Sequence, residues 1–477
     1  MDEMIFAYIF IALFFIVMVG LGIWFTRRAK TGSDAFILAG RQAPWFIVAG
    51  SIFATWVNTA TLLGYGGTGY TVGISGYWSG GAFMLATVWL GFFMIPRLRK
   101  TGITTIPEFF EKYFGVSHRL VALVLGLGRD MGVTAGISIA MAFIFQDLFD
   151  VTLFTALLIT IGVVLLYTGA GGMWAVLYTD TIASVLIIVG TTLMIPLAVA
   201  QLGEWSMIAA EVPSSHLEVW GAGVPQSIGW LLTGVFITFG YQTVIQRGLA
   251  AKDDETAKKA FLGGGLLALF WYMVPFVLGT IGRALYPDIY PDDAFIELAY
   301  LYGPYVGIFF MIVLISSAMS TISSCILGIS SNLSLDVYQR LINQQATREK
   351  IVWVQRFCLL LVIVIAAIVG HAMPFVLELL WLGGRVMAAG MAPVFLALIF
   401  WPKARIAAKT TMAAMVTGAA LTVIGQLYGW MHFGELEGEV VFIWETDPIL
   451  FGLPFSVLIL LLGVPREAKR RIQERAA

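Results

Sequence analysis

The chain has 477 residues, of which 59% are hydrophobic and 12% are charged, and its mean hydropathy is +0.89. Soluble domains usually contain about 25% charged residues, so the composition excludes an ordinary soluble domain and predicts an all-α membrane protein with many spanning helices. The net charge of −1 does not bear on nucleic-acid binding, and no basic tract suggests nucleic acid as a partner. The two cysteines, both in apolar runs, predict neither a disulfide framework nor a metal cluster.

Apolar windows of about 20 residues predict about thirteen membrane spans. The first span follows the acidic N-terminus directly and without a small-residue cleavage site, so we interpret it as a spanning helix and not as a removed signal peptide. The expected spans cover residues 4–26, 44–74 (broken), 78–96, 119–147, 152–169, 174–200, 226–247, 261–283, 304–334, 351–371, 374–400, 409–430 and 447–464.

Basic and acidic loops alternate along this assignment. Most of the 28 Lys and Arg residues fall in loops on one side, for example Arg27, Arg99 and Lys258, whereas the opposite loops contain acids such as Glu204 and Asp292. The positive-inside rule then places the N-terminus outside and the C-terminus in the cytoplasm. We therefore expect a multi-pass protein of the plasma membrane with an odd number of spans.

The second expected span is irregular between residues 54 and 70. Non-helical backbone at membrane depth is tolerated only where it lines a cavity or is buried in protein. A break there exposes carbonyl oxygens that suit a cation and a helix N-terminus that suits an anionic group, although close packing of glycine-rich helices is the alternative interpretation. The polar residues that form no single stripe, and the glycines after them, are Thr55, Asn58, Thr59 and Thr61, then Gly64, Gly66, Gly67 and Gly69.

Ionisable residues inside the expected spans form a second group of candidates. Asp180 lies early in the sixth span, where it either serves function or caps a helix end. Arg129 and Asp130 are adjacent in the fourth span, and because helix neighbours do not face each other we expect each to find a partner elsewhere. Gln246 and Arg247 are expected to mark the membrane boundary after the seventh span.

An apolar run between residues 308 and 335 contains six hydroxyl side chains within nine residues. Four of them are spaced i, i+3, i+4 and i+7, so they share one helix face. Such a face in a membrane either packs against neighbouring helices or binds a small cation. The six residues are Ser316, Ser317, Ser320, Thr321, Ser323 and Ser324, with Ser317, Ser320, Thr321 and Ser324 on the shared face.

The sequence has no constellation that predicts an enzyme. The histidines lack metal-ligand spacing, and there is no Walker loop. Concentrating transport is therefore expected to use an ion gradient and not ATP.

Four motifs together resemble the sodium:solute symporter family, over roughly residues 5–430. They are Tyr167-Thr168-x-x-Gly171-Gly172-Met173-x-Ala175 followed by Asp180, Ser317-Ala318-Met319-Ser320-Thr321, Gln246-Arg247-Gly248-Leu249-Ala250-Ala251-Lys252, and Ala39-Gly40-Arg41. The resemblance implies a leucine-transporter-type inverted repeat of five plus five helices with one leading and two trailing helices. It implies a single domain over residues 1–477, with repeat one at about 44–200 and repeat two at about 226–400.

The resemblance also implies residue roles. The family's sodium site carries over to the backbone carbonyls of Ala54, Val57 and Ser317 and the hydroxyls of Ser320 and Thr321, which leaves Ser316, Ser323 and Ser324 for packing. Asp180 matches an acid on the sodium exit path. Substrate contacts carry over to the break and the seventh span, at Thr55, Trp56, Asn58, Thr59, Thr61, Tyr241 and Gln242.

The expected function is sodium-coupled import of a small organic solute by alternating access. Monocarboxylates, amino acids and vitamins are the expected solute classes, Na⁺ is the co-transported ion, no organic cofactor is expected, and the chain is expected to function as a monomer. Proline is doubtful, because proline carriers have an Asp where this chain has Trp56. The alternatives are proton coupling through Asp180 and transport of a quaternary amine such as choline, which Trp56 and Tyr241 would bind through cation–π contacts.

Overall fold

The computed structural model describes residues 2–29, 32–372, 376–401, 406–433, 435–436, 439–440 and 447–476. These ranges are helical apart from their loops and one short antiparallel pair, in which Glu435 of β1 (Glu435–Leu436) pairs with Val440 of β2 (Glu439–Val440). The expected all-helical class is therefore confirmed.

The first half of the chain forms the helices α1 (Asp2–Ala29), α2 (Ser33–Leu38), η1 (Ala39–Arg41), α3 (Trp45–Trp56), α4 (Thr59–Val72), η2 (Gly73–Gly76), α5 (Tyr77–Trp89), η3 (Leu90–Met94), α6 (Ile95–Thr101), α7 (Ile106–Phe114), α8 (Val116–Phe149), α9 (Leu153–Leu202), α10 (Trp205–Glu211) and η4 (Ser214–Leu217). The second half forms α11 (Val224–Gly240), α12 (Gln242–Ala250), α13 (Asp254–Trp271), α14 (Met273–Leu285), η5 (Pro291–Asp293), α15 (Ala294–Tyr300), α16 (Pro304–Asn332), η6 (Leu333–Ile342), α17 (Arg348–Ala372), α18 (Val376–Phe400), α19 (Ala408–Phe433) and α20 (Ile449–Ala476).

Nine helices in the described ranges are long and apolar enough to cross a membrane, or ten if the bent pair α11 and α12 is one span. This is fewer than the expected count of about thirteen, because several expected spans join into continuous helical segments. Residues 152–169 and 174–200 form the single helix α9, with a kink at Gly172, where φ is 55°. Likewise, α4 continues through η2, α5 and η3 into α6.

Two helices are interrupted inside the bundle. The predicted break separates α3 from α4 at Val57, which is extended (φ −98°, ψ 97°), and the Asn58 side chain caps α4 by accepting a hydrogen bond from the Thr61 amide at 3.0 Å. The second break lies at Tyr241, where α11 and α12 meet at a bend of 50°. The expectation of one unbroken span over residues 226–247 is therefore wrong.

The glycines after the first break lie inside α4 and serve close packing. A Cβ atom on Gly279 of α14 would come within 1.9 Å of the Gly66 carbonyl oxygen, and one on Gly69 within 2.4 Å of the Phe276 carbonyl oxygen. Only glycine permits the backbones of α4 and α14 to approach this closely. The non-helical backbone is therefore confined to the short link between α3 and α4.

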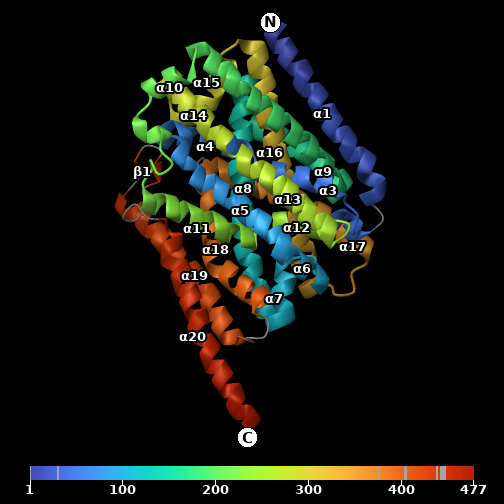
Figure 1. Cartoon of the computed structure of the whole chain (residues 1–477). Helices are drawn as coiled ribbons and strands as arrows, with labels where there is room; N and C mark the ends of the chain where they lie inside the picture. Colours follow the sequence, from blue (N-terminus) through green and yellow to red (C-terminus); the bar gives the residue numbers. More distant parts are fainter. Residues whose placement is uncertain are drawn as a thin grey trace.

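The hydroxyl-bearing helix α16 lies in the middle of the bundle (Figure 1). It packs against α3, α8 and α9, and 89% of the apolar window in α16 and η6 is buried. By contrast, α1 packs along α9 at one edge of the bundle, and α19 and α20 pack together at the opposite edge (Figure 1). The first break and the hydroxyl face of α16 thus meet inside the protein, away from lipid.

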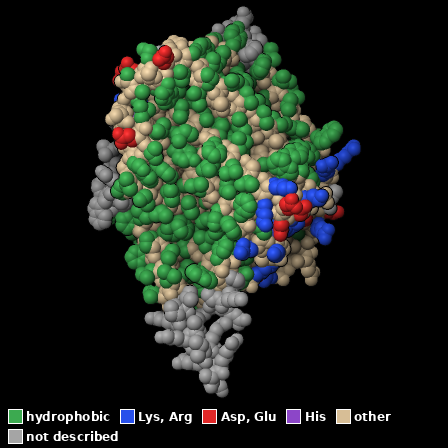
Figure 2. All heavy atoms as spheres, viewed as in Figure 1, with side chains coloured by type: hydrophobic (Ala, Val, Ile, Leu, Met, Phe, Trp, Pro, Cys, Tyr) green, Lys and Arg blue, Asp and Glu red, His purple; other side chains and the backbone are tan. Residues whose placement is uncertain are grey.

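The surface divides into an apolar belt and two polar ends. Lys and Arg side chains gather where Figure 1 places α6, α12 and α17, with a few acidic side chains among them, and further acidic side chains lie at the other end, near α10 and α15 (Figure 2). We call the first of these ends, which α6, α7, α12, η6 and the start of α17 form, the basic end. Its separation from the acidic end matches the loop alternation in the sequence.

An ion-pair network joins the elements of the basic end. Glu111 of α7 accepts a hydrogen bond from Arg340 of η6 at 2.7 Å and also pairs with Arg119 of α8. The Arg119 Nε atom donates to Asp336 of η6 at 2.8 Å, and Thr105, which caps α7, donates to the same carboxylate at 2.9 Å. Desolvation alone would raise the pKa of Glu111, but the two arginines outweigh it and lower the pKa below the ordinary value of 4.5.

Replacing Glu111 with glutamine should make the thermal stability of the protein depend less on pH in the acidic range. A carboxylate whose pKa is lowered by folding contributes stability above its ordinary pKa and loses that contribution as the pH falls through its folded pKa. The wild-type midpoint of thermal unfolding should therefore fall as the pH drops below about 4.5, and Glu111→Gln should start lower at pH 7 and fall less. Glu349→Gln, at an exposed site, is the control, and parallel wild-type and Glu111→Gln profiles would refute this.

Candidate functional site

Hydroxyl groups of α16 bond across the bundle to the carbonyl end of α3. The Ser320 hydroxyl donates to the Ala54 carbonyl at 2.9 Å, and also to the Ser317 carbonyl at 2.9 Å. The Thr321 hydroxyl lies 3.4 Å from the carbonyl oxygens of both Ala54 and Thr55. The structure therefore brings together four of the expected sodium ligands, the oxygens of Ala54, Ser317, Ser320 and Thr321.

The break explains why α3 offers carbonyl oxygens at this point. A helix leaves its last carbonyl groups without intrahelical partners, and α3 ends at Trp56 because Val57 is extended. Val57, the remaining expected sodium ligand, is this extended residue and is buried. The spacing of Ser320 and Thr321 on α16 places both hydroxyls on the face that meets α3.

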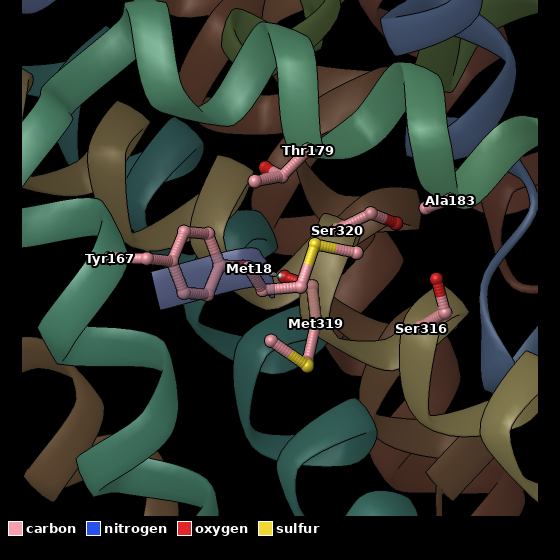
Figure 3. A pocket seen from close by; sticks show the side chains of 7 residues that line it. All are labelled: Met18, Tyr167, Thr179, Ala183, Ser316, Met319 and Ser320. Atoms are coloured by element: carbon pink, nitrogen blue, oxygen red, sulfur yellow. Dashed lines mark hydrogen bonds between the residues drawn. The ribbon is translucent and has the colours of Figure 1, made fainter. Parts of the chain in front are cut away.

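The remaining hydroxyls of α16 divide between packing and a second polar group. Ser323 donates to the Ser320 carbonyl within its own helix at 3.0 Å, as expected for packing. Ser316 and Ser320 border a narrow gap against α9, which Met18, Tyr167, Thr179, Ala183 and Met319 also line (Figure 3). Ser324 differs from both, because it contacts the Asp180 carboxylate at 3.4 Å.

Asp180 and Arg247 form a buried ion pair beside Ser324, which lies one helical turn after Ser320 on α16. The Arg247 Nη2 atom lies 2.6 Å from Asp180 Oδ2, and the two side chains are 1% and 0% exposed. Ser51 of α3 donates to the same Asp180 oxygen at 2.6 Å and accepts from Arg247 Nε at 2.7 Å. The pair therefore connects α3, α9, α12 and α16. Arg247 was expected at a membrane boundary, and its burial inside the bundle was not predicted.

The polar residues of the break fasten it to neighbouring helices. The Thr59 hydroxyl donates to the Leu314 carbonyl at 2.8 Å and lies 3.0 Å from the Ser317 hydroxyl. Thr61 donates to the Trp56 carbonyl at 3.0 Å, which also accepts from Tyr272 of α14 at 2.9 Å. The expected substrate residues Thr55, Trp56, Asn58, Thr59 and Thr61 are all buried at this junction.

An aromatic cluster links the two breaks. The rings of Trp56 and Tyr241 lie 5.3 Å apart, and Phe83 of α5 lies 5.0 Å from Trp56. The Arg129 guanidinium of α8 lies over the Tyr241 ring, 3.8 Å from its centroid. Arg129 was not expected at the site, and its place in an apolar span was the only signal for it in the sequence.

Gln242 is the expected substrate residue that the structure does not bring to the break. Its side-chain oxygen accepts a hydrogen bond from the Ile106 amide at 2.8 Å, and its nitrogen donates to the Thr104 carbonyl at 3.3 Å. Gln242 therefore holds the start of α7 against α12.

Several known proteins are similar to this chain over most of its length. The chain is similar to sodium/glucose cotransporter 4 of Danio rerio (25% identical over 95% of this chain and 77% of that protein) and to the sodium/proline symporter of Haemophilus influenzae (26%, 90% and 88%). It is also similar to high-affinity choline transporter 1 of Drosophila melanogaster (24%, 93% and 76%).

Solved structures show the same fold. A Na⁺-coupled sialic acid symporter in a substrate-bound outward-open state superimposes with a TM-score of 0.81 at 19% identity, covering 96% of this chain and 97% of that one. A nucleobase-cation-symport-1 family transporter in a closed conformation gives 0.61 at 15% identity, covering 91% and 95%. The model of the sodium:solute symporter family matches residues 36–418, and the chain belongs to that family.

Proposed function

We propose that the protein imports a small organic solute together with sodium by alternating access. The observation that supports this most directly is the convergence of the Ser320 and Thr321 hydroxyls on the Ala54 carbonyl. Carbonyl oxygens of a broken helix are typical sodium ligands in transporters. An ion bound there replaces hydroxyl-to-carbonyl hydrogen bonds with bonds from the ion to the same oxygens.

Sodium at this position couples to solute binding through the break. The ion joins α3 to α16 and fixes the residues from Thr55 to Thr61, where the solute binds together with Tyr241. Because linkage is reciprocal, sodium raises the affinity for the solute by the same factor as the solute raises the affinity for sodium. In the inward-opening step α16 moves away from the break, and sodium leaves past Asp180.

The proposal includes an inverted repeat and an orientation. The two broken helices, α3–α4 and α11–α12, open the two five-helix repeats, α1 leads them, and α19 and α20 follow, which makes thirteen crossings. The basic end faces the cytoplasm of a plasma-membrane protein that acts as a monomer, and sodium is its only cofactor.

The experiment is solute uptake into proteoliposomes. Purified protein is tested with monocarboxylates, amino acids, vitamins and choline under sodium, lithium, proton or no gradient. The proposal requires accumulation of at least one solute under a sodium gradient, and equal uptake without any cation gradient would contradict it. Accumulation driven by a proton gradient but not by sodium would instead support proton coupling through Asp180.

A further inference from the structure

Arg129 is buried without a complete set of partners. Its residue is 7% exposed, and its Nε and Nη1 atoms have no hydrogen-bond partner in the part of the chain that the structure describes. Its Nη1 atom lies 3.9 Å from the Asp130 carboxylate, which is too long for a hydrogen bond. Burying a guanidinium whose donor atoms lack acceptors costs free energy, so we expect a ligand to supply the missing acceptors.

The position of Arg129 connects it to the proposed solute site. Its guanidinium stacks on Tyr241, the residue at the second break, and Tyr241 packs against Trp56 at the end of α3. The Trp56 Nε1 atom is also buried and lacks a hydrogen-bond partner within the described ranges. Arg129 and Trp56, each of which carries a donor atom without a hydrogen bond, therefore both contact the Tyr241 ring.

Both groups can donate hydrogen bonds and neither can accept them. A ligand that satisfies them must supply acceptors, and a carboxylate supplies only acceptors, in a plane that matches the guanidinium. Asp130 does not satisfy these donors, because its Oδ1 atom stays 3.9 Å from Arg129 Nη1 and its Oδ2 atom lies on the α16 side, where a Cβ atom on Gly328 would be 3.7 Å away.

The same geometry argues against a quaternary amine. Trp56 and Tyr241 form an aromatic wall of the kind that binds such a cation. However, the positive charge of Arg129 already lies 3.8 Å from the Tyr241 ring. A second cation on this wall would be repelled by the first.

We propose that the transported solute carries a carboxylate, and that Arg129, assisted by the Trp56 indole, binds it. This inference rests on the proposed transport function, but its test measures ligand binding and not transport. Arg129 then determines the solute class, whereas Ser320 and Thr321 determine the ion.

The test compares carboxylates with uncharged counterparts of the same shape. Full-length protein in detergent and sodium is titrated with propionate and propionamide, nicotinate and nicotinamide, pantothenate and panthenol, and with choline, and the rise in unfolding temperature is measured. At least one carboxylate should bind about 10- to 100-fold more tightly than its counterpart, as expected for a charge-assisted bidentate contact.

Variants then assign the preference to Arg129. Arg129→Lys keeps the charge but loses the planar pair of donors, so carboxylate affinity should fall about 10-fold. Arg129→Gln combined with Asp130→Asn leaves no unpaired charge that would hinder folding, and should bind carboxylates and amides alike. The control is Arg385→Lys, because the Arg385 guanidinium already pairs with Asp447 at 3.1 Å and Gln426 at 3.2 Å, and it should retain the preference.

Three results would overturn the inference: no carboxylate raises the unfolding temperature, choline or an uncharged compound binds more tightly than every carboxylate, or the double variant keeps the preference. Failure of sodium coupling is a separate result. It appears as carboxylate binding that depends on Arg129 but is unchanged when potassium chloride replaces sodium chloride.

Discussion

Replacing Arg247 with alanine should strongly destabilise the protein. The change leaves the Asp180 carboxylate, which is 0% exposed, without its cationic partner. Removing one member of a buried ion pair costs about 3–5 kcal/mol, because the remaining charge stays desolvated. We expect a large fall in the unfolding temperature and in the yield of monodisperse protein in detergent.

The reason for this large effect is the number of elements that meet at the pair. Arg247 also donates to the Thr243 carbonyl at 2.8 Å and to Ser324, and Ser51 bridges the two charged groups. One guanidinium therefore satisfies acceptors from α3, α9, α12 and α16. A lysine at position 247 keeps the charge but cannot make this set of directed hydrogen bonds, so Arg247→Lys should be intermediate.

A double variant separates the effect of an unpaired buried charge on stability from the effect of a changed side-chain shape. Asp180→Asn with Arg247→Gln removes both charges and should recover most of the stability that Arg247→Ala loses. Lys259→Ala is the matched control, since Lys259 pairs with Glu255 at 2.6 Å on the surface, with both side chains mostly exposed, and no measurable change is expected. Wild-type stability in Arg247→Ala would refute the structural role of the pair.

The same double variant tests the proposed sodium path. If sodium leaves past Asp180, the folded double variant should still bind sodium and solute but transport slowly, because the carboxylate that receives the ion is gone. Binding is measured by thermal shift and transport by uptake into proteoliposomes. Unchanged uptake would remove Asp180 from the path while leaving its structural role intact.

The hydroxyl face and the helix break could be predicted from the sequence because each depends on residues that are close together in the chain. The spacing of Ser317, Ser320 and Thr321 defines a helix face whatever the helix packs against, and polar residues before a glycine run indicate a break. The structure places that face and that break in contact. What spacing alone could not supply was which carbonyl each hydroxyl meets, and that part of the prediction came from the family resemblance.

The residues that sequence reasoning missed are those whose partners are distant in the chain. Arg247 follows Asp180 by 67 positions in the chain and lies near a cluster of basic loop residues, so it resembled an ordinary membrane-boundary arginine. Arg129 contacts Tyr241 at the residue where α12 bends away from α11. No local pattern predicts that bend, because Gly240 and Tyr241 occur within an apolar run of the usual length for one span.

Replacing Ser320 or Thr321 with alanine should raise the sodium concentration needed for half-maximal binding. Each change removes a hydroxyl oxygen that lies within hydrogen-bond distance of the Ala54 carbonyl. Losing a polar contact to a charged group costs about 1.5–3 kcal/mol, which corresponds to about 10- to 150-fold in affinity. Ser320→Ala should have the larger effect, because its bonds at 2.9 Å are shorter than those of Thr321 at 3.4 Å.

The control for these substitutions lies on the same helix. Ser330 is buried and donates to the Leu327 carbonyl of its own helix at 3.0 Å, so Ser330→Ala removes a comparable hydroxyl without touching the break. Sodium titrations by thermal shift, with and without a transported solute, give the apparent affinities. Because coupling is reciprocal, solute affinity at a fixed, subsaturating sodium concentration should fall in Ser320→Ala and stay unchanged in Ser330→Ala. If Ser320→Ala and Thr321→Ala titrate like Ser330→Ala, sodium does not bind at this break, and the hydroxyls of α16 serve packing alone.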